Sequence, residues 1–160
     1  MKKKLFIKCS IAVAACLLLG FAASVAANTS GDEWFSKLEK PFFNPPTWLF
    51  ATIWMILFLA MGIAAGIVWS KGFYHKWVKV ALYHFGFQLI LTGFWFILFF
   101  GFHKPFLALL ISMALLVLLL LTIKWFRIIS DTAAALMIPH ALWVLFLVAF
   151  TFEIWRINVL

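Results

Sequence analysis

A row of polar side chains interrupts one of the apolar segments of this chain. His84, Gln88 and Thr92 are spaced by four residues and Trp95 follows three residues later, so a helix would place all four on one face. Polar groups facing lipid are costly, so this face is expected to point into a helix bundle. Gln88 and Thr92 can then either hydrogen-bond a neighbouring helix or orient a polar group of a ligand, and the spacing leaves both open.

A second set of candidate residues is aromatic. Trp54 and Phe58 are four residues apart, and Trp143 and Phe146 are three apart. From the residues alone, the spacing of Trp54 and Phe58 favours ordinary core packing. His140 is a lone imidazole with no second histidine placed to complete a site, so packing is favoured over metal or haem ligation, and no metal site is predicted.

No group of side chains in the apolar segments is suited to acid–base or nucleophilic catalysis. The segments contain no paired carboxylates, no nucleophile–base pair and no cluster of metal ligands. No catalytic residue and no required cofactor are therefore predicted. An ion-coupled transporter is also disfavoured, because coupling usually needs a charged residue within a span and none is found there.

The composition indicates which elements must position these residues. Of the 160 residues, 67% are hydrophobic and 11% are charged, whereas a soluble domain has roughly 45–50% and about 25%. This excludes a soluble globule, a disordered chain and a disulfide scaffold. The net charge of +8 is interpreted as a membrane topology signal rather than a nucleic-acid surface, because the chain has no polar helix to carry a basic stripe.

Five apolar stretches are long enough to cross a bilayer, which needs about 20 residues as a helix. The alternation of a membrane barrel is absent, and helices satisfy their own backbone hydrogen bonds in lipid. We therefore predict an all-α integral membrane protein, a bundle of five transmembrane helices forming a single domain over residues 1–160. The predicted spans are residues 5–27, 48–69, 80–102, 105–123 and 132–152.

The charges between the spans predict the topology. Nine Lys and Arg residues fall on the side of the N-terminus and four on the other side, which also carries most of the acids. The positive-inside rule then places the N-terminus in the cytoplasm and the C-terminus outside, as in a bacterial inner-membrane protein. The first span also resembles a secretory signal peptide; it is long for a signal, so it is retained as a span with cleavage as the alternative.

The loop predicted over residues 28–47 combines aromatic side chains with three prolines. Prolines restrict such a loop to few shapes. One interpretation is that its aromatic residues anchor the protein at the level of the lipid headgroups. The other is a rigid aromatic flap over a cavity between the helices. The loop and its end contribute the candidate residues Trp34, Phe35, Pro45 and Trp48.

Several motifs in order along the chain resemble the TspO/MBR family of tryptophan-rich sensory proteins, which includes the mitochondrial translocator protein (peripheral benzodiazepine receptor). The resemblance runs from about Trp34 to Asn158 and also implies five helices. It is carried by the segment WFSKLEKPFFNPPTW (residues 34–48), Trp54, Met61-Gly62, Gln88, Trp95, Phe99-Phe100-Gly101, Pro139, Trp143, Phe146 and Trp155-Arg156-Ile157-Asn158.

The resemblance implies a membrane receptor or translocator that binds protoporphyrin, haem or similar flat hydrophobic ligands between Trp54 and Trp143, for transport, sensing or regulation. A light- and oxygen-dependent porphyrin-degrading enzyme using these two tryptophans, and a ligand-free scaffold, are the alternatives. Expected partners are the ligand, membrane lipid and a second copy in a homodimer, and no nucleic acid. The implied ligand-binding residues are Trp34, Phe35, Pro45, Trp48, Trp54, Phe58, Gln88, Thr92, Trp95, His140, Trp143, Phe146 and Leu147.

The chain departs from the family pattern at positions that would line a pocket. Thr92 stands where Asn is common, His140 where Tyr is common and Leu147 where a small residue is frequent, which leaves ligand preference open. Gly62 and Gly66 predict a close helix contact, within the chain or in a dimer, with the internal contact favoured. A sterol-contact-like pattern, with Phe in place of its central Tyr, is formed by Val148, Phe152 and Arg156.

Overall fold

The computed structural model describes the backbone of residues 2–28 and 31–159, and the side chains of residues 3–25 and 33–158. These ranges contain helices and no strand, with five helices long and apolar enough to cross a membrane, which confirms the predicted fold class. The elements are α1 (Lys2–Asn28), α2 (Gly31–Lys37), α3 (Thr47–Ser70), α4 (Lys76–Phe96), the π-helical segment η1 (Ile97–Gly101), α5 (Pro105–Ile129) and α6 (Asp131–Val159).

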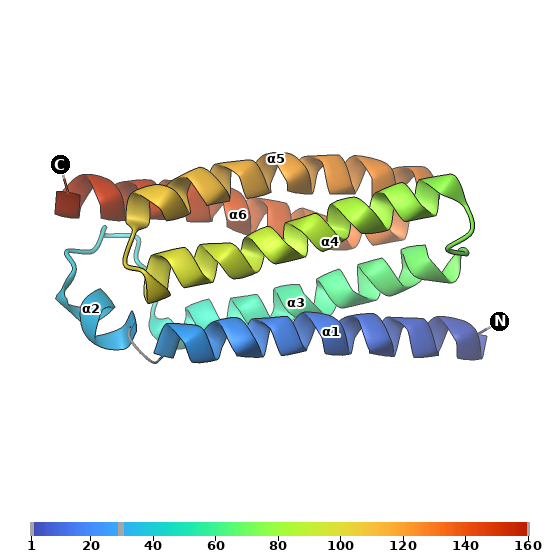
Figure 1. Ribbon diagram of the computed structural model, residues 1–160, viewed down its shortest axis with the longest axis horizontal. Helices are drawn as coiled ribbons and strands as arrows, with labels where there is room; N and C mark the ends of the chain where they lie inside the picture. Colours follow the sequence, from blue (N-terminus) through green and yellow to red (C-terminus); the bar gives the residue numbers. More distant parts are fainter. Residues whose placement is uncertain (1, 29–30, 160) are drawn as a thin grey trace.

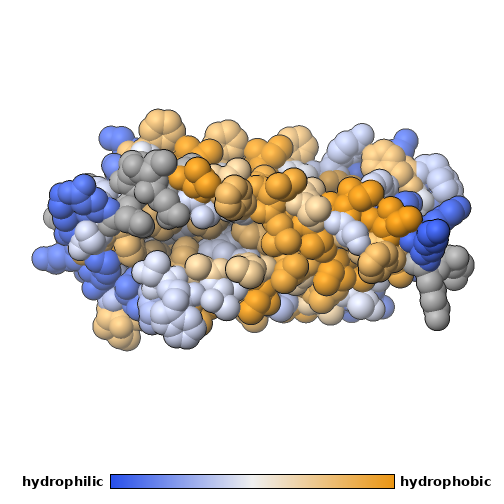
Figure 2. Space-filling model, turned by 90° about the horizontal axis from the view of Figure 1, so that it is seen from below, coloured by the Kyte–Doolittle hydropathy of each residue, from blue (hydrophilic) through white to orange (hydrophobic). Residues whose placement is uncertain are grey.

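The five long helices run along one axis, with the two termini at opposite ends, as an odd number of crossings requires (Figure 1). Contacts between the helices place them around the bundle in the order α1, α3, α6, α5 and α4, and the contact that closes the ring, between α1 and α4, is the sparsest. An apolar band separates two hydrophilic ends on the surface shown in Figure 2. The protein is therefore an integral, multi-pass membrane protein.

The helices extend beyond most of the predicted span bounds. The first turn of α4 contains Lys76, Trp77 and Lys79, and α5 continues to Ile129, so Ser130 alone joins α5 to α6. A helix can continue into the headgroup region when its residues have long amphipathic side chains, because the polar tips of these side chains reach water. Hydropathy alone does not detect these additional turns. The Ser130 hydroxyl accepts a hydrogen bond from the amide of residue 133 (3.3 Å) and so caps the first turn of α6.

The long loop contains a helix that was not predicted. Its prolines begin only at Pro41, so the preceding residues are free to form α2. Within this short helix, the Lys37 ammonium lies 2.9 Å from the Glu33 carboxylate four residues earlier. In Figure 1, α2 lies at the end of the bundle that also carries the C-terminus. We call α2 and residues 38–46 together the flap.

Two glycines bring α1 and α3 into backbone contact. A Cβ added at Gly62 would lie 2.4 Å from the Cα of Val13, and one added at Gly66 would lie 2.4 Å from the Cα of Cys9. Real Cβ atoms are essentially never this close, so any larger residue would force the helices apart. These two glycines therefore serve packing within the chain, the favoured alternative.

The end of α4 widens into a π-helical turn. The amide of Phe102 donates to the carbonyl of Ile97 (2.9 Å), and that of Lys104 donates to Leu98 (3.0 Å), so the hydrogen bonds span more residues than in an α-helix. His103 then adopts a left-handed conformation (φ 54°) just before α5 begins. The wider turn precedes a sharp reversal between two antiparallel helices.

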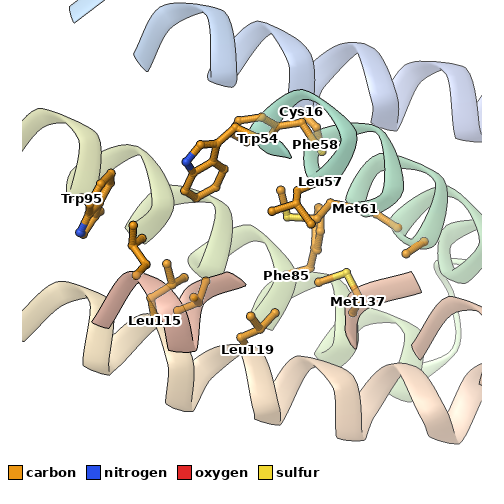
Figure 3. Packing of buried hydrophobic residues seen from close by; sticks show 14 of the residues in the cluster. Cys16, Trp54, Leu57, Phe58, Met61, Phe85, Trp95, Leu115, Leu119 and Met137 are labelled. Atoms are coloured by element: carbon orange, nitrogen blue, oxygen red, sulfur yellow. The ribbon is translucent and has the colours of Figure 1, made fainter. Parts of the chain in front are cut away.

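The core of the bundle is formed by aromatic and aliphatic side chains from α3, α4, α5 and α6. Trp95, Met61, Leu115 and Leu119 are fully buried, and Trp54 is nearly so. Figure 3 shows Trp54 and Trp95 extending into the interior from α3 and α4, with Met61 further along α3. This packed layer supports one wall of the cavity described next.

Candidate ligand-binding site

A cavity of about 890 Å³ lies between α1, α3, the end of α4, α6 and the flap. Pockets that bind small organic ligands typically measure about 300–1,000 Å³ and are mostly apolar. Most of this lining is aromatic or aliphatic. The largest contribution comes from the first three turns of α3, through Thr47, Phe50, Ala51, Trp54, Met55 and Phe58.

The α1 wall is shaped by a glycine. A Cβ added at Gly20 would lie 2.6 Å from the Phe58 ring, so the absence of a side chain allows this ring to lie directly against α1. Leu17, Phe21 and Ser24 complete the wall. Phe21 is 69% exposed. The cavity is therefore bounded partly by side chains at the molecular surface.

Three phenylalanines close the far side of the cavity. Phe96, Phe100 of the π-helical turn and Phe150 of α6 all line it. The Phe35 ring from the flap packs edge-on against Phe100 (5.8 Å between centroids). Edge-to-face pairs of this kind are favourable and hold both rings in place. The flap therefore rests on the same aromatic cluster that forms the cavity wall.

The flap is fixed at two points outside the cavity. The Asn158 side-chain amide of α6 accepts a hydrogen bond from the Glu39 amide (2.9 Å) and donates one to the Glu39 carbonyl (3.0 Å). The Trp34 ring stacks on His103 with centroids 4.6 Å apart. Two contacts thus connect the flap to the end of α6 and to the α4–α5 turn. Asn158 was noted in the sequence only as part of a motif.

Four of the residues predicted to bind a ligand line the cavity: Phe35, Pro45, Trp54 and Phe58. Trp34 lies outside it, and Trp48 is 69% exposed on the surface of α3. Trp48 sits in the first turn of α3, the position expected of an interfacial anchor. Both predicted roles of the loop, headgroup anchoring and a flap over a ligand, stay predictions.

The polar row on α4 does not line the cavity: Gln88 contacts neighbouring helices, whereas Thr92 and His84 hydrogen-bond to carbonyls of α4 itself. The Gln88 side-chain nitrogen lies 3.2 Å from Nδ1 of His140 on α6 and 3.5 Å from the Met61 sulfur. The Thr92 hydroxyl donates to the backbone carbonyl of Gln88 (2.9 Å). His84, nearer the helix start, pairs its Nδ1 with the Val80 carbonyl (2.8 Å). A direct ligand contact for Gln88 and Thr92 stays a prediction.

Several buried polar atoms around this row have no hydrogen-bond partner among the described residues. They include Gln88 Oε1, His140 Nε2 and the indole nitrogens of Trp54, Trp95 and Trp143. Burying such groups unpaired is costly. The interior next to the cavity therefore contains both hydrogen-bond donors and acceptors that a polar group or water could satisfy.

Trp54 is the ring that connects this interior to the cavity. It stacks near Trp95 (6.4 Å) and meets His140 edge-on (5.9 Å). Its ring is perpendicular to Trp143 (6.5 Å, 88°). The two tryptophans expected to enclose a flat ligand between them are thus in edge-to-face contact with each other here.

Trp143 and Phe146 belong to a different depression. They stack on each other (4.9 Å) and line an open groove of about 500 Å³ between α3 and α6, together with Pro139. Leu147 is fully buried in the core and does not line the cavity. A flat ligand enclosed between Trp54 and Trp143 would require the two rings to separate.

The sterol-contact-like residues lie on α6 outside the cavity. Phe152 is 41% exposed, and Arg156 forms a two-pronged pair with the Glu153 carboxylate (3.0 and 2.7 Å). The Arg156 guanidinium is therefore engaged in an ion pair within α6. Val148 is half-buried. A sterol role for these residues stays a prediction.

Sequence reasoning missed the α1 wall and several phenylalanines. Phe50 could have been found, because it precedes Trp54 by one helical turn on the same face. Leu17 and Gly20 gave no signal, because α1 is apolar all round and shows no preferred face. Lys40 was considered only as a topology charge and as part of the motif at residues 34–48, although it lines the cavity. Among the described residues, no three metal-ligating side chains cluster.

Comparison with known proteins identifies the architecture. The sequence model of the TspO/MBR family matches residues 12–156, which include most of α1 and all of α3 to α5. The match therefore covers each of the elements that enclose the cavity.

Individual proteins of this family are similar over nearly their whole length. A tryptophan-rich protein TspO of Archaeoglobus fulgidus is 37% identical over 153 residues, covering 95% of this chain and 97% of that protein. The translocator protein of Homo sapiens is 33% identical, covering 86% of this chain and 82% of that protein. The tryptophan-rich sensory protein of Cereibacter sphaeroides is 30% identical, covering 91% and 88%.

Proposed function

This chain belongs to the TspO/MBR family of membrane proteins, and we propose that it is a receptor or translocator for tetrapyrroles such as protoporphyrin IX or haem. The observation that carries the proposal is the aromatic cavity of about 890 Å³ under the flap. Its volume suits a ligand of several fused or linked rings. The lining supplies broad π faces, which favour stacking on a flat macrocycle over binding a flexible chain.

The proposed binding mode places the macrocycle between the α1 wall and the aromatic face of α3. Trp54 and Phe58 offer their rings to it, and the exposed Phe21 and Met55 mark a side open to the bilayer. A hydrophobic ligand dissolved in lipid could reach the cavity there without crossing water. Release or sensing would then depend on movement of the flap, which the Asn158 contacts hold in place.

For the cellular setting, we propose a bacterial inner membrane with the N-terminus in the cytoplasm, the flap outside and a homodimer as the functional form. The distribution of Lys and Arg supports this orientation. Labelling of single cysteines introduced at residues 42 and 74, on opposite connections, would test it. Reaction of residue 74 with an impermeant reagent in intact cells would contradict the orientation.

The test of ligand binding is a titration of tryptophan fluorescence with protoporphyrin IX in nanodiscs of neutral lipid. Saturable quenching at micromolar concentration is expected. Ala51 lines the cavity, so Ala51→Phe should fill part of it and weaken binding, whereas Ala114→Phe on the lipid-facing side of α5 is the matched control. A titration without saturation would favour the ligand-free scaffold and contradict the proposal.

A second candidate function is light- and oxygen-dependent degradation of bound porphyrin. It is favoured by one observation: the Trp54 ring forms part of the cavity wall and also contacts Trp95 and Trp143, so several indoles lie near the ligand. The photoexcited ligand and oxygen would supply the reactivity in this case, and the side chains would hold the ligand.

A further inference from the structure

The cavity has a polar end. Most of its lining is aromatic or aliphatic, but Ser36, Lys40 and Asn44 line it on the side of the flap, which lies at one end of the bundle, and Ser24 and Thr47 are also polar. Lys40 is the only charged side chain among the described residues of this lining. The cavity therefore matches an amphipathic molecule better than a uniformly apolar one, with positive charge at the end where the molecule meets water.

The Lys40 ammonium is held in place by the flap itself. Its Nζ donates to the carbonyls of Ser36 and Leu38 (both 3.2 Å) and lies 5.0 Å from the centroid of the Phe35 ring. An ammonium group has three donors, and these contacts use two of them. The neighbouring residue Glu39 is tied to Asn158 through its backbone, which fixes the adjoining backbone as well.

No carboxylate neutralises this lysine within the described structure. The ion pairs found there join Lys37 to Glu33, Arg127 to Asp131 and Arg156 to Glu153, and none includes Lys40. Carbonyl oxygens and a ring face stabilise a cation only partly. The Lys40 ammonium is half-buried and has one remaining donor. It is therefore suited to bind an anion inside the cavity.

Building on the proposed function, we propose that Lys40 binds a carboxylate of the ligand while the flat apolar body of that ligand lies against Trp54 and Phe58. The ligand class is therefore an amphipathic ring acid, such as a tetrapyrrole with carboxylate side chains. A neutral sterol would leave Lys40 without an anion, so it fits this cavity less well. Lys40 then also sets the orientation, with the acid groups toward the flap.

The test compares protoporphyrin IX with its dimethyl ester, which has the same macrocycle but no negative charge. Both are titrated into the protein in nanodiscs of neutral phosphatidylcholine, with empty nanodiscs subtracted. The acid is expected to bind the native chain at least about tenfold more tightly than the ester does, the effect of one charge-assisted hydrogen bond. Added salt should weaken binding of the acid alone, because Lys40 is only half-buried and its charge is screened.

The variants Lys40→Gln and Lys37→Gln form a matched pair, because both remove a flap lysine but only Lys40 lines the cavity. Lys40→Gln should reduce binding of the acid to the level of the ester and leave the ester unchanged. Lys37→Gln should change neither. Unchanged ester binding also demonstrates that the flap still folds without Lys40.

Two outcomes would overturn the proposal. If Lys40→Gln weakens acid and ester equally, the lysine only supports the flap; if it weakens neither, the carboxylate binds elsewhere. In both cases ester binding to the native chain would leave the proposed function standing. Failure of both porphyrins to bind the native chain would instead refute the proposed function itself.

Discussion

Replacing Gly66 by alanine adds one carbon atom at the closest approach of α1 and α3. The new Cβ would lie 2.4 Å from the Cα of Cys9 and 2.8 Å from its amide nitrogen, whereas ordinary contacts begin at 3.4 Å. Both neighbours are backbone atoms, so no rotamer change relieves the clash. The helices must separate by about 1 Å, and the interhelical contacts next to this point are weakened.

The cost can be estimated from overpacking in protein cores, which is about 1–3 kcal/mol. Alanine also improves helix propensity over glycine by about 1 kcal/mol. Gly86 on α4 separates the two terms, because a Cβ there would meet nothing within 4 Å. We expect Gly66→Ala to be about 2 kcal/mol less stable than Gly86→Ala, which corresponds to about 4–8 °C in Tm for a chain of this size.

A buried thiol supplies the assay. Cys16 is 1% exposed among the core residues, and Cys9→Ser leaves it as the only cysteine of the chain. A fluorogenic maleimide followed during heating then reports the exposure of Cys16. Gly66→Ala should shift the midpoint downward and raise the labelling rate at 25 °C, whereas Gly86→Ala should shift it slightly upward. Equal midpoints for the two variants would refute the close contact of α1 with α3.

Three further outcomes follow from the contacts around the cavity. Asn158→Ala removes both hydrogen bonds to the flap, so hydrogen exchange of residues 38–46 should accelerate about tenfold with the helices unaffected; unchanged exchange would contradict anchoring. Gln88→Leu leaves the buried His140 without its partner and should lower stability by about 1–3 kcal/mol in thermal unfolding, whereas a neutral effect would show the pair is dispensable. If the protein degrades porphyrin in light and air, Trp54→Phe should slow the loss of porphyrin absorbance more than Trp143→Phe, because only Trp54 lines the cavity; equal rates would exclude this role.

The number and type of helices were predictable because each span combines length with near-complete absence of charge. The inward direction of Gln88 was also predictable, because lipid does not solvate a polar amide. Its partner was not, because contact between α4 and α6 depends on the order of helices around the bundle. Sequence spacing describes one helix at a time and does not contain that order.

The candidate site was predictable where a lining residue lies one helical turn from a residue of the family motifs, as Phe58 does from Trp54. It was less predictable where the wall is formed by a helix without a polar face, as in α1. The relation of Trp54 to Trp143 also needed the structure, because ring orientation depends on side-chain rotation. Lys40 escaped notice because a lysine near a membrane surface is ordinarily a topology signal.

The π-helical turn after Phe96 has a consequence for where the chain can lose a residue without disturbing the cavity. A π turn is the geometric equivalent of one additional residue within an α-helix. Removing one residue from Ile97–Gly101 would restore the regular α-helical repeat, and the residues beyond the turn would keep about the same rotational position relative to the rest of α4. Removing one residue from the regular part of α4 would instead rotate everything beyond it by about 100°, including Phe100, which lines the cavity, and His103, on which Trp34 stacks. A change of one residue in length should therefore be tolerated better at the π-helical turn than within Lys76–Phe96.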